Sequence, residues 1–213
     1  MTPRADMLRH WYRRIGKRTI DALVAAAGIV MLAPLGALLA LAIRATLGSP
    51  VFFRQRRPGL RGLPFELVKF RTMTDQRDAA GRPLPDADRL TPFGRLLRST
   101  SLDELPELWN VFKGEMSLVG PRPLLTVYLE RYTPAQARRH LVRPGITGLA
   151  QVTGRNAVSW ERKFALDLEY VERCSLILDA RILVLTIWQV VTRQGVNQPG
   201  QATAEEFMGT VGR

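Results

Sequence analysis

The chain has 213 residues, enough to bury a hydrophobic core in a single domain. Its one cysteine, Cys174, cannot pair within the chain, so a disulfide-stabilised scaffold is excluded, and its apolar neighbours predict a buried, reduced thiol. Because 31 Lys and Arg residues outnumber 19 Asp and Glu residues, the net charge of +12 favours a polyanionic partner: nucleic acid, an acidic membrane surface or a phosphorylated substrate.

An apolar segment near the N-terminus narrows this choice. Residues 22–43 contain no charged side chain. At about 1.5 Å per residue, a helix of this length just covers a hydrocarbon core of roughly 30 Å. A signal peptide is the competing interpretation, but the apolar run is long for one, and Arg44 follows it instead of a clean cleavage site. The segment is therefore predicted to be a membrane helix.

The flanks of this segment favour a helix that enters and leaves by the same leaflet. Five basic residues precede it between positions 9 and 18 and five follow between positions 44 and 61, whereas a spanning helix carries excess positive charge on one side. Pro34, near the middle, predicts a bend. We expect residues 1–48 to form a membrane-associated N-terminus with a re-entrant helix broken at Pro34, and residues 49–213 to form a cytoplasmic domain. A kinked single-pass helix is the alternative.

The domain after this segment opens with short elements. Residues 51–54 and 65–70 are strand-like, and the Pro and Gly residues between them predict a small hairpin. Residues 75–92 are polar and lack apolar periodicity, which is typical of a loop. Residues 105–112 have the apolar spacing of a short helix, which Gly114 ends.

Helices dominate the second half. Residues 124–141 are helical but interrupted, with Thr133 as the cap of a second helix, and the run RPGITGLAQVTGR is predicted to be a loop. Residues 160–172 are helical. Residues 176–191 form a nearly apolar helix that belongs either to the core or, as we slightly favour, to the membrane interface. The sequence thus predicts an α/β fold, mostly helical, with a small hairpin, long irregular loops, a re-entrant helix and interfacial amphipathic helices.

Two adjacent carboxylates, Asp103 and Glu104, stand out in a basic chain. Pro106 is tolerated only in a first helical turn, so both acids are expected at the positive end of a helix, where Asp103 stays ionised. An ionised carboxylate can attack an electrophilic phosphorus while its neighbour binds metal or transfers a proton. The spacing alone favours a structural alternative, because Ser101 and Glu104 also match a capping box.

Several basic residues near this pair are candidates for phosphate binding. Arg122 lies between Pro121 and Pro123, and this stiffness lowers the entropy lost when its guanidinium binds a phosphate. A plain turn explains the same sequence. The other candidates lie in strand-like or Gly/Pro-rich sequence or just before the acidic pair, and each taken singly is explained as a surface cation: Lys69, Arg71, Arg98, Arg143 and Arg155.

Several stretches together resemble a known family. The stretches PVFFRQRRPGLRG, KFRTM, SLDELPELWNVFKGEMSLVGPRPL and VRPGITGLAQVTGRNAVSW, with the Pro-broken apolar N-terminus, resemble the bacterial sugar transferases, the monotopic phosphoglycosyl transferases. The resemblance runs in order from about Lys17 to beyond Asp179. It is strongest to the small members, such as the one that initiates glycan assembly for bacterial N-linked glycosylation. One departure is Ala33, where family members often have Ser before the proline.

The resemblance implies transfer of a sugar phosphate from a UDP-sugar to polyprenyl phosphate, with release of UMP and a requirement for Mg²⁺. Asp103 would be the nucleophile that forms a phosphosugar–aspartate, and Glu104 would act with it as metal partner or as base. Lys69, Arg98 and Arg122 would hold phosphates. The resemblance implies three further substrate-binding residues: Arg143, Arg155 and Asp179. The two arginines would contact the nucleotide or the sugar.

The resemblance also implies a location at the cytoplasmic face of the bacterial inner membrane. A membrane-tethered nucleic-acid-binding module is an alternative, but the tryptophans fall in apolar helical spacing, so no nucleic acid is expected as partner. An inactive scaffold is the third hypothesis, which the intact acidic pair and cations disfavour. The sequence does not identify the sugar, the glycan pathway or the oligomeric state, and a homodimer stays open.

Overall fold

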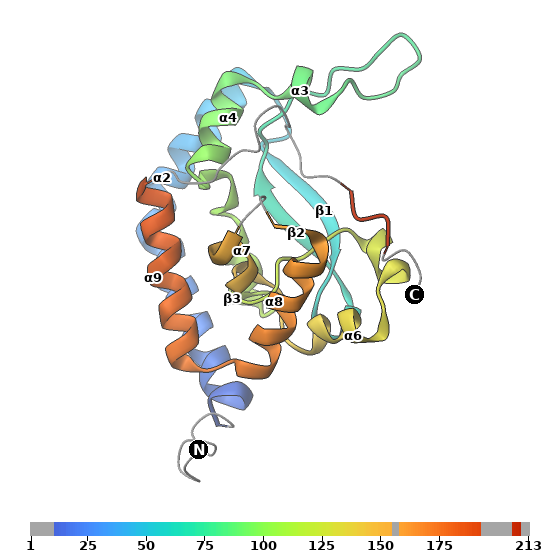
Figure 1. Ribbon diagram of the computed structural model, residues 1–213. Coiled ribbons are helices and arrows are strands. Elements are labelled where there is room, and N and C mark those ends of the chain that lie inside the picture. The colour runs from blue at the N-terminus through green and yellow to red at the C-terminus, as the bar shows by residue number, and fades with distance from the viewer. Residues whose placement is uncertain (1–10, 155–157, 193–205, 210–213) are drawn as a thin grey trace.

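The structure is a computed structural model that describes residues 11–154, 158–192 and 206–209. It is mostly helical, as expected, and contains two small sheets. A π-helical turn, η1 (Tyr12–Gly16), leads into the long helix α2 (Lys17–Thr46). In Figure 1, α2 is the blue helix that rises behind α9, and the loop with α3 extends from the upper right of the domain.

Helix α2 is one helix of 30 residues with Pro34 inside it, so its helical backbone is not interrupted at the proline, and the bend expected there stays a prediction. Both of its ends contact the domain. Ala25 packs into a cluster with Phe65 and Val111, and Ile43 packs into another around the end of the hairpin. Side chains of its middle are exposed, among them Val30, Met31 and Leu38. Within the described residues, α2 alone is long and apolar enough to cross a membrane.

The predicted hairpin is confirmed and is longer than expected. Strands β1 (Phe52–Pro58) and β2 (Pro64–Phe70) pair antiparallel, joined by a 3₁₀ turn, η2 (Leu60–Gly62). Phe65 and Leu67 face the core, and the period of two along a strand puts Lys69 on the same face. The hairpin therefore delivers Lys69 to the interior.

The polar stretch after the hairpin is a loop, as predicted, and contains one short helix, α3 (Asp86–Arg89). Helix α4 (Pro92–Ser99) follows, with Thr91 as its cap. A 3₁₀ turn, η3 (Leu102–Glu104), precedes α5 (Glu107–Lys113), which ends at Gly114 in the left-handed conformation, as the sequence predicted.

A buried asparagine on α5 fixes this helix to the hairpin. Asn110 is fully buried; its Oδ1 accepts a hydrogen bond from Val68 N, and its Nδ2 donates to Glu66 O. Arg18 of α2 donates to Val111 O and Phe112 O at the other end of α5. Helix α5 is thus held between the hairpin and α2.

A second, parallel sheet was not predicted. Strands β3 (Ser117–Val119) and β4 (Gly145–Thr147) pair where the sequence suggested only a turn and a loop. Gly145 in β4 and Gly120, directly after β3, allow the backbones to touch, because a Cβ on Gly145 would lie 2.1 Å from Gly120 N. Between the strands the chain is helical and interrupted before Thr133, as predicted, but much of it is 3₁₀ helix: the elements are η4 (Thr126–Arg131), α6 (Pro134–Ala137), which Thr133 caps, and η5 (Arg138–Leu141).

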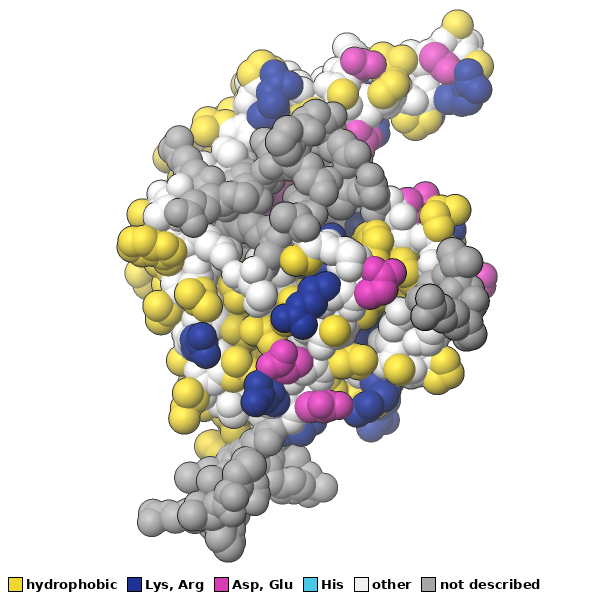
Figure 2. Space-filling model, viewed as in Figure 1, with side chains coloured by type: hydrophobic (Ala, Val, Ile, Leu, Met, Phe, Trp, Pro, Cys, Tyr) yellow, Lys and Arg dark blue, Asp and Glu magenta, His cyan; other side chains and the backbone are white. Residues whose placement is uncertain are grey.

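Three helices complete the domain: α7 (Leu149–Gly154), α8 (Trp160–Arg173) and α9 (Leu176–Thr192). The helical predictions for α8 and α9 are confirmed, whereas α7 replaces a predicted loop. Cys174 is buried, as predicted. Hydrophobic side chains gather over α9 on the left of Figure 2, and exposed residues along this helix include Ile177, Val184 and Trp188. This apolar surface agrees with a position at a membrane.

Candidate active site

The acidic pair lies in the 3₁₀ turn η3, before α5, and not in the first turn of α5 as predicted. Ser101 has φ 57° and makes no side-chain cap hydrogen bond, so the capping-box alternative is wrong. Instead, the Glu104 carboxylate accepts hydrogen bonds from Lys69 Nζ at 2.6 Å and from Arg122 Nη2 at 2.7 Å. The sequence predicted that these cations lie near the pair, and the structure brings them together.

Asp103 differs from its neighbour. Its side chain is buried at 8% exposure, and within the described residues no hydrogen bond or ion pair to its carboxylate is found. Burial raises the pKa of Asp103, while the positive charges of Lys69, Arg122 and Arg98 oppose this. The two carboxylates thus have distinct environments: Glu104 is neutralised by two cations, and the Asp103 oxygens are uncommitted.

Glu107, in the first turn of α5, was missed by the sequence reasoning. It is 2% exposed, and its Oε1 lies 3.0 Å from Lys69 Nζ. Burial raises the pKa of Glu107 to about 7, although the charge of Lys69 acts in the opposite direction. The sequence feature that could have identified Glu107 is its position directly after Pro106. That position predicts only an ordinary acidic residue in the first turn of a helix.

The two cations dominate the electrostatics of Glu104. Burial alone would raise its pKa, but Arg122 and Lys69 outweigh burial and lower the pKa to about 2. Burial would lower the pKa of Lys69, yet the carboxylates of Glu104 and Glu107 hold it above its ordinary value. Glu104 and Lys69 are therefore both charged at neutral pH.

Arg122 is positioned through its backbone as well as by its prolines. Its carbonyl oxygen accepts a hydrogen bond from Arg139 Nη2 at 2.8 Å, and Gly120, just before it, packs against the backbone of residues 143–145. Arg98, at the end of α4, donates from Nε to Thr72 Oγ1, and its charge acts on Asp103. The structure therefore places Lys69, Arg98 and Arg122 at the acidic pair.

Three other predicted substrate-binding residues have structural partners instead. Arg71 is buried and donates to the carbonyl oxygens of Leu47, Ser49 and Met73, so it fixes the chain after α2. Arg143 donates to Gly114 O at the end of α5.

Asp179 is the third predicted substrate-binding residue that has structural partners. Arg155, which was also predicted to bind substrate, lies outside the described residues. Asp179 accepts hydrogen bonds from Tyr12, Lys17 and Tyr170, and it ties α9 to the start of α2. The structure does not bring Arg71, Arg143 or Asp179 to the acidic pair.

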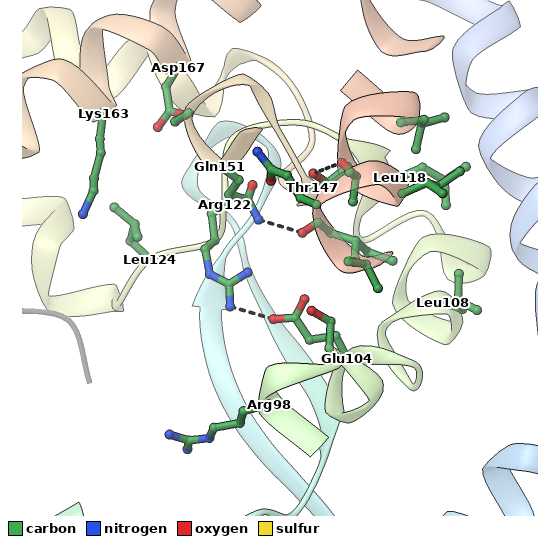
Figure 3. A pocket seen from close by; sticks show the side chains of 18 of the residues that line it. Arg98, Glu104, Leu108, Leu118, Arg122, Leu124, Thr147, Gln151, Lys163 and Asp167 are labelled. Carbon is green, nitrogen blue, oxygen red and sulfur yellow. Dashed lines mark hydrogen bonds and ion pairs between the residues drawn. The ribbon is translucent and has the colours of Figure 1, made fainter. Parts of the chain in front are cut away.

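A cavity of about 700 Å³ adjoins the site. Glu104, Arg98 and Arg122 line one part of it, and Figure 3 shows Arg122 and Glu104 pointing toward each other. The wall between α2, α5 and α9 is apolar, with the following side chains: Leu32, Leu108, Leu183, Ile187 and Val190. Side chains of α8 line a further part. The cavity thus joins charged groups to an apolar wall formed partly by the membrane-type helix.

The carboxylates at the site are few for a metal centre built from protein side chains alone. Within the described part of the chain, no group of three or more Asp, Glu, His or Cys side chains could hold a metal ion. Mg²⁺ is usually bound by one or two carboxylates together with substrate phosphates and water. The uncommitted carboxylate of Asp103 beside Glu104 fits that pattern.

This arrangement, an acidic pair held by cations beside a partly apolar cavity, suits an enzyme that acts on phosphorylated substrates at a membrane. Residues 12–193 match the family described as bacterial sugar transferase. The match covers most of the chain, so the protein belongs to the bacterial sugar transferase family.

Several curated relatives are similar over most of the chain. The uncharacterized sugar transferase EpsL of Bacillus subtilis is 60% identical over 168 residues, which cover 79% of this chain and 83% of EpsL. A UDP-glucose:undecaprenyl-phosphate glucose-1-phosphate transferase of Caulobacter vibrioides is 42% identical, over 83% of this chain and 70% of that protein. The exopolysaccharide production protein ExoY of Rhizobium meliloti is 38% identical, over 85% of this chain and 88% of ExoY.

Proposed function

We propose that this protein transfers a sugar 1-phosphate from a UDP-sugar to polyprenyl phosphate, giving polyprenyl diphosphate sugar and UMP, as an early membrane step of polysaccharide or glycoconjugate synthesis. The observation that carries the proposal is the uncommitted Asp103 carboxylate next to Glu104, which Lys69 and Arg122 hold. The name of the Caulobacter relative, a UDP-glucose:undecaprenyl-phosphate glucose-1-phosphate transferase, supports the substrate classes.

In the first step, a carboxylate oxygen of Asp103 attacks the β-phosphorus of the UDP-sugar. The new O–P bond forms as the bond from that phosphorus to the bridging oxygen breaks, and the electron pair leaves with UMP. Lys69, Arg98 and Arg122 supply the positive charge that an anionic nucleophile needs to approach a diphosphate. The product is a phosphosugar–aspartate.

In the second step, a phosphate oxygen of polyprenyl phosphate attacks the same phosphorus, and the O–P bond to Asp103 breaks, which restores its carboxylate. The apolar wall of the cavity, formed by Leu32 of α2 and by Leu183 and Ile187 of α9, suits the first units of a polyprenyl chain. Asp103 and Glu104 would hold Mg²⁺, which when bound neutralises phosphate charge.

We place the domain on the cytoplasmic face, with α2 entering and leaving the same leaflet. Both ends of α2 are bonded to the domain, through Lys17 to Asp179 and through packing of Ile43, while apolar side chains of the middle are exposed. A helix that spanned the bilayer would have to give up one of these sets of contacts. Because α2 is longer than the roughly 30 Å core requires, its middle can enter the leaflet at an angle.

The experiment is UMP release from a panel of UDP-sugars by detergent-solubilised protein with polyprenyl phosphate and Mg²⁺, combined with intact mass without acceptor. We expect metal-dependent UMP release and a phosphosugar adduct, both lost in Asp103→Asn and kept in Asp88→Asn, an isosteric change in the loop after β2. Turnover by folded Asp103→Asn would remove Asp103 as nucleophile. Absence of UMP release across a broad panel would contradict the proposed function.

A further inference from the structure

One face of α8 borders the same cavity and has no part in the mechanism above. Four residues spaced at i, i+3, i+4 and i+7 lie on it, as helical geometry requires: Trp160, Lys163, Phe164 and Asp167. Figure 3 shows Lys163 and Asp167 extending from α8 on the side of the cavity across from Glu104, with Arg122 between. The face combines aromatic rings with a carboxylate.

Asp167 is buried, and only one of its oxygens is engaged. Oδ2 accepts hydrogen bonds from Arg139 Nε at 3.0 Å and Nη2 at 2.7 Å, while within the described residues no hydrogen bond to Oδ1 is found. Oδ1 is not fully buried: it keeps a small accessible surface, although Asp167 as a whole is only 4% exposed. The carboxylate therefore offers a free acceptor on a residue that lines the cavity.

Arg139 fixes the direction of this acceptor. Its guanidinium is 3% exposed, and besides Asp167 it bonds Arg122 O at 2.8 Å and the Tyr132 hydroxyl at 3.3 Å. One buried side chain thus sets both the loop that presents Arg122 and the orientation of Asp167. A carboxylate held in this way is preorganised to accept a hydrogen bond, with no rotamer entropy to lose on binding.

Trp160 supplies the second element of the face. Its ring stacks on Phe164 at 5.8 Å between centroids, and Lys163 Nζ lies 4.6 Å from the centroid of its ring. Trp160 and Asp167 line the same cavity two helical turns apart, so an aromatic side chain and a carboxylate acceptor face one space. Such a pair suits a hydroxylated ring, whose C–H groups pack on apolar surface while its hydroxyl groups donate hydrogen bonds.

From these observations we infer that Asp167 and Trp160 form a subsite for a hydroxylated ring of the substrate, with Asp167 Oδ1 accepting a hydrogen bond from a hydroxyl group. The inference rests on the proposed function, because it takes the ring to be part of a UDP-sugar. The ring is either the transferred sugar or the ribose, and both offer the same hydroxyl chemistry.

The test measures binding of UDP-glucose and of UDP to the Asp103→Asn protein, which binds without turnover. Adding Asp167→Asn is expected to weaken UDP-glucose binding about tenfold to a hundredfold, the effect of losing a hydrogen bond to a charged group. Unchanged affinity for UDP then assigns Asp167 to the sugar, and an equal loss for UDP assigns it to the ribose. Glu169→Gln, two positions along α8 in an exposed pair with Arg173, is the matched control.

Because Asp167→Asn leaves Arg139 without its carboxylate and can destabilise the fold, ligand variants on the Asp103→Asn protein provide a second arm. The 2-, 3-, 4- and 6-deoxy forms of UDP-glucose and the 2′- and 3′-deoxyribose forms each remove one hydroxyl. At least one is expected to bind about tenfold more weakly. If Asp167→Asn folds and binds normally, or if no deletion weakens binding, the subsite is refuted. If UDP-glucose does not bind at all while another UDP-sugar does, the deletions move to that sugar; if no UDP-sugar binds, the proposed function fails first.

Discussion

Lys69 and Glu104 form an ion pair with 2.6 Å between Nζ and Oε1, although 35 residues separate them in sequence. The same Nζ lies 3.0 Å from Glu107 Oε1. One ammonium group at the end of β2 therefore holds the turn with the acidic pair and the first turn of α5 together.

Replacement of Lys69 by Met should cost about 3–5 kcal/mol in the free energy of unfolding, because two buried carboxylates lose their shared counterion. Adding Glu107→Gln should restore part of this loss, since it removes one of the unpaired charges. Chemical unfolding of the two single variants and the double variant gives the coupling free energy between Lys69 and Glu107. Lys113→Met, which removes a more exposed pair with Glu115, should cost less than about 1 kcal/mol. Additive effects of Lys69→Met and Glu107→Gln would contradict the shared-counterion account.

The pH dependence of stability should carry the signature of Glu107. Its folded-state pKa is raised from 4.5 to about 7, so the folded protein binds this proton more tightly than the unfolded chain, and stability should rise as pH falls from about 7 to about 4.5. The full effect of this shift is about 3 kcal/mol. Glu104, with a pKa of about 2, acts in the opposite direction and mostly below this window. The free energy of unfolding is measured at pH 5 and pH 8 for the unmodified protein and for Glu107→Gln. If the two proteins show equal pH dependence, Glu107 is not its source.

Gly145→Ala should prevent the pairing of β3 with β4, because the new Cβ would lie 2.1 Å from Gly120 N and 2.4 Å from Thr147 O. We expect a loss of more than about 4 kcal/mol, or no folded protein. Gly36→Ala is the control: nothing lies within 4 Å of a Cβ there, and alanine favours a helix by about 0.5–1 kcal/mol. Thermal unfolding in detergent measures both. Wild-type stability of Gly145→Ala would show that the two backbones are not in close contact.

The topology of α2 can be measured with single cysteines at positions 13 and 80, both exposed, since the native Cys174 is buried. A membrane-impermeant thiol reagent should label neither position in intact cells and both in inverted vesicles. The physical reason is that Lys17 and Ile43, toward opposite ends of α2, both contact the domain. Labelling of position 13 alone in intact cells would establish a spanning helix. Pro34→Ala should shift part of the population in that direction, because it removes the cause of a bend.

Much of the fold follows from local sequence signals, whereas the tertiary pairings do not. The hairpin, the Gly114 stop, the Thr133 cap and α8 were predicted because each depends on turn chemistry or on periodicity within one segment. The β3–β4 pair was missed because each strand has only three residues, too few for a periodic signal.

The site was also predicted only in part, because local motifs identify residues but not their tertiary contacts. Lys69, Arg98 and Arg122 were recognised through motifs around them, and all three lie at the acidic pair. Arg71 has the same chemistry and lies two residues from Lys69, but its donors are used by backbone carbonyls, which a sequence does not reveal. Glu107 was missed because its burial depends on the hairpin that covers it.

The contact between Lys17 and Asp179 has a consequence for the biogenesis of the protein. These residues are 162 positions apart, so this contact cannot form until α9 has left the ribosome, whereas the bonds from Arg18 to α5 can form earlier. During synthesis the apolar helix is available to the bilayer long before its polar partner exists, and closing so long a loop delays final folding. The ion pair between Lys17 and Asp179 is thus a late contact in the folding of the domain, because it requires α9.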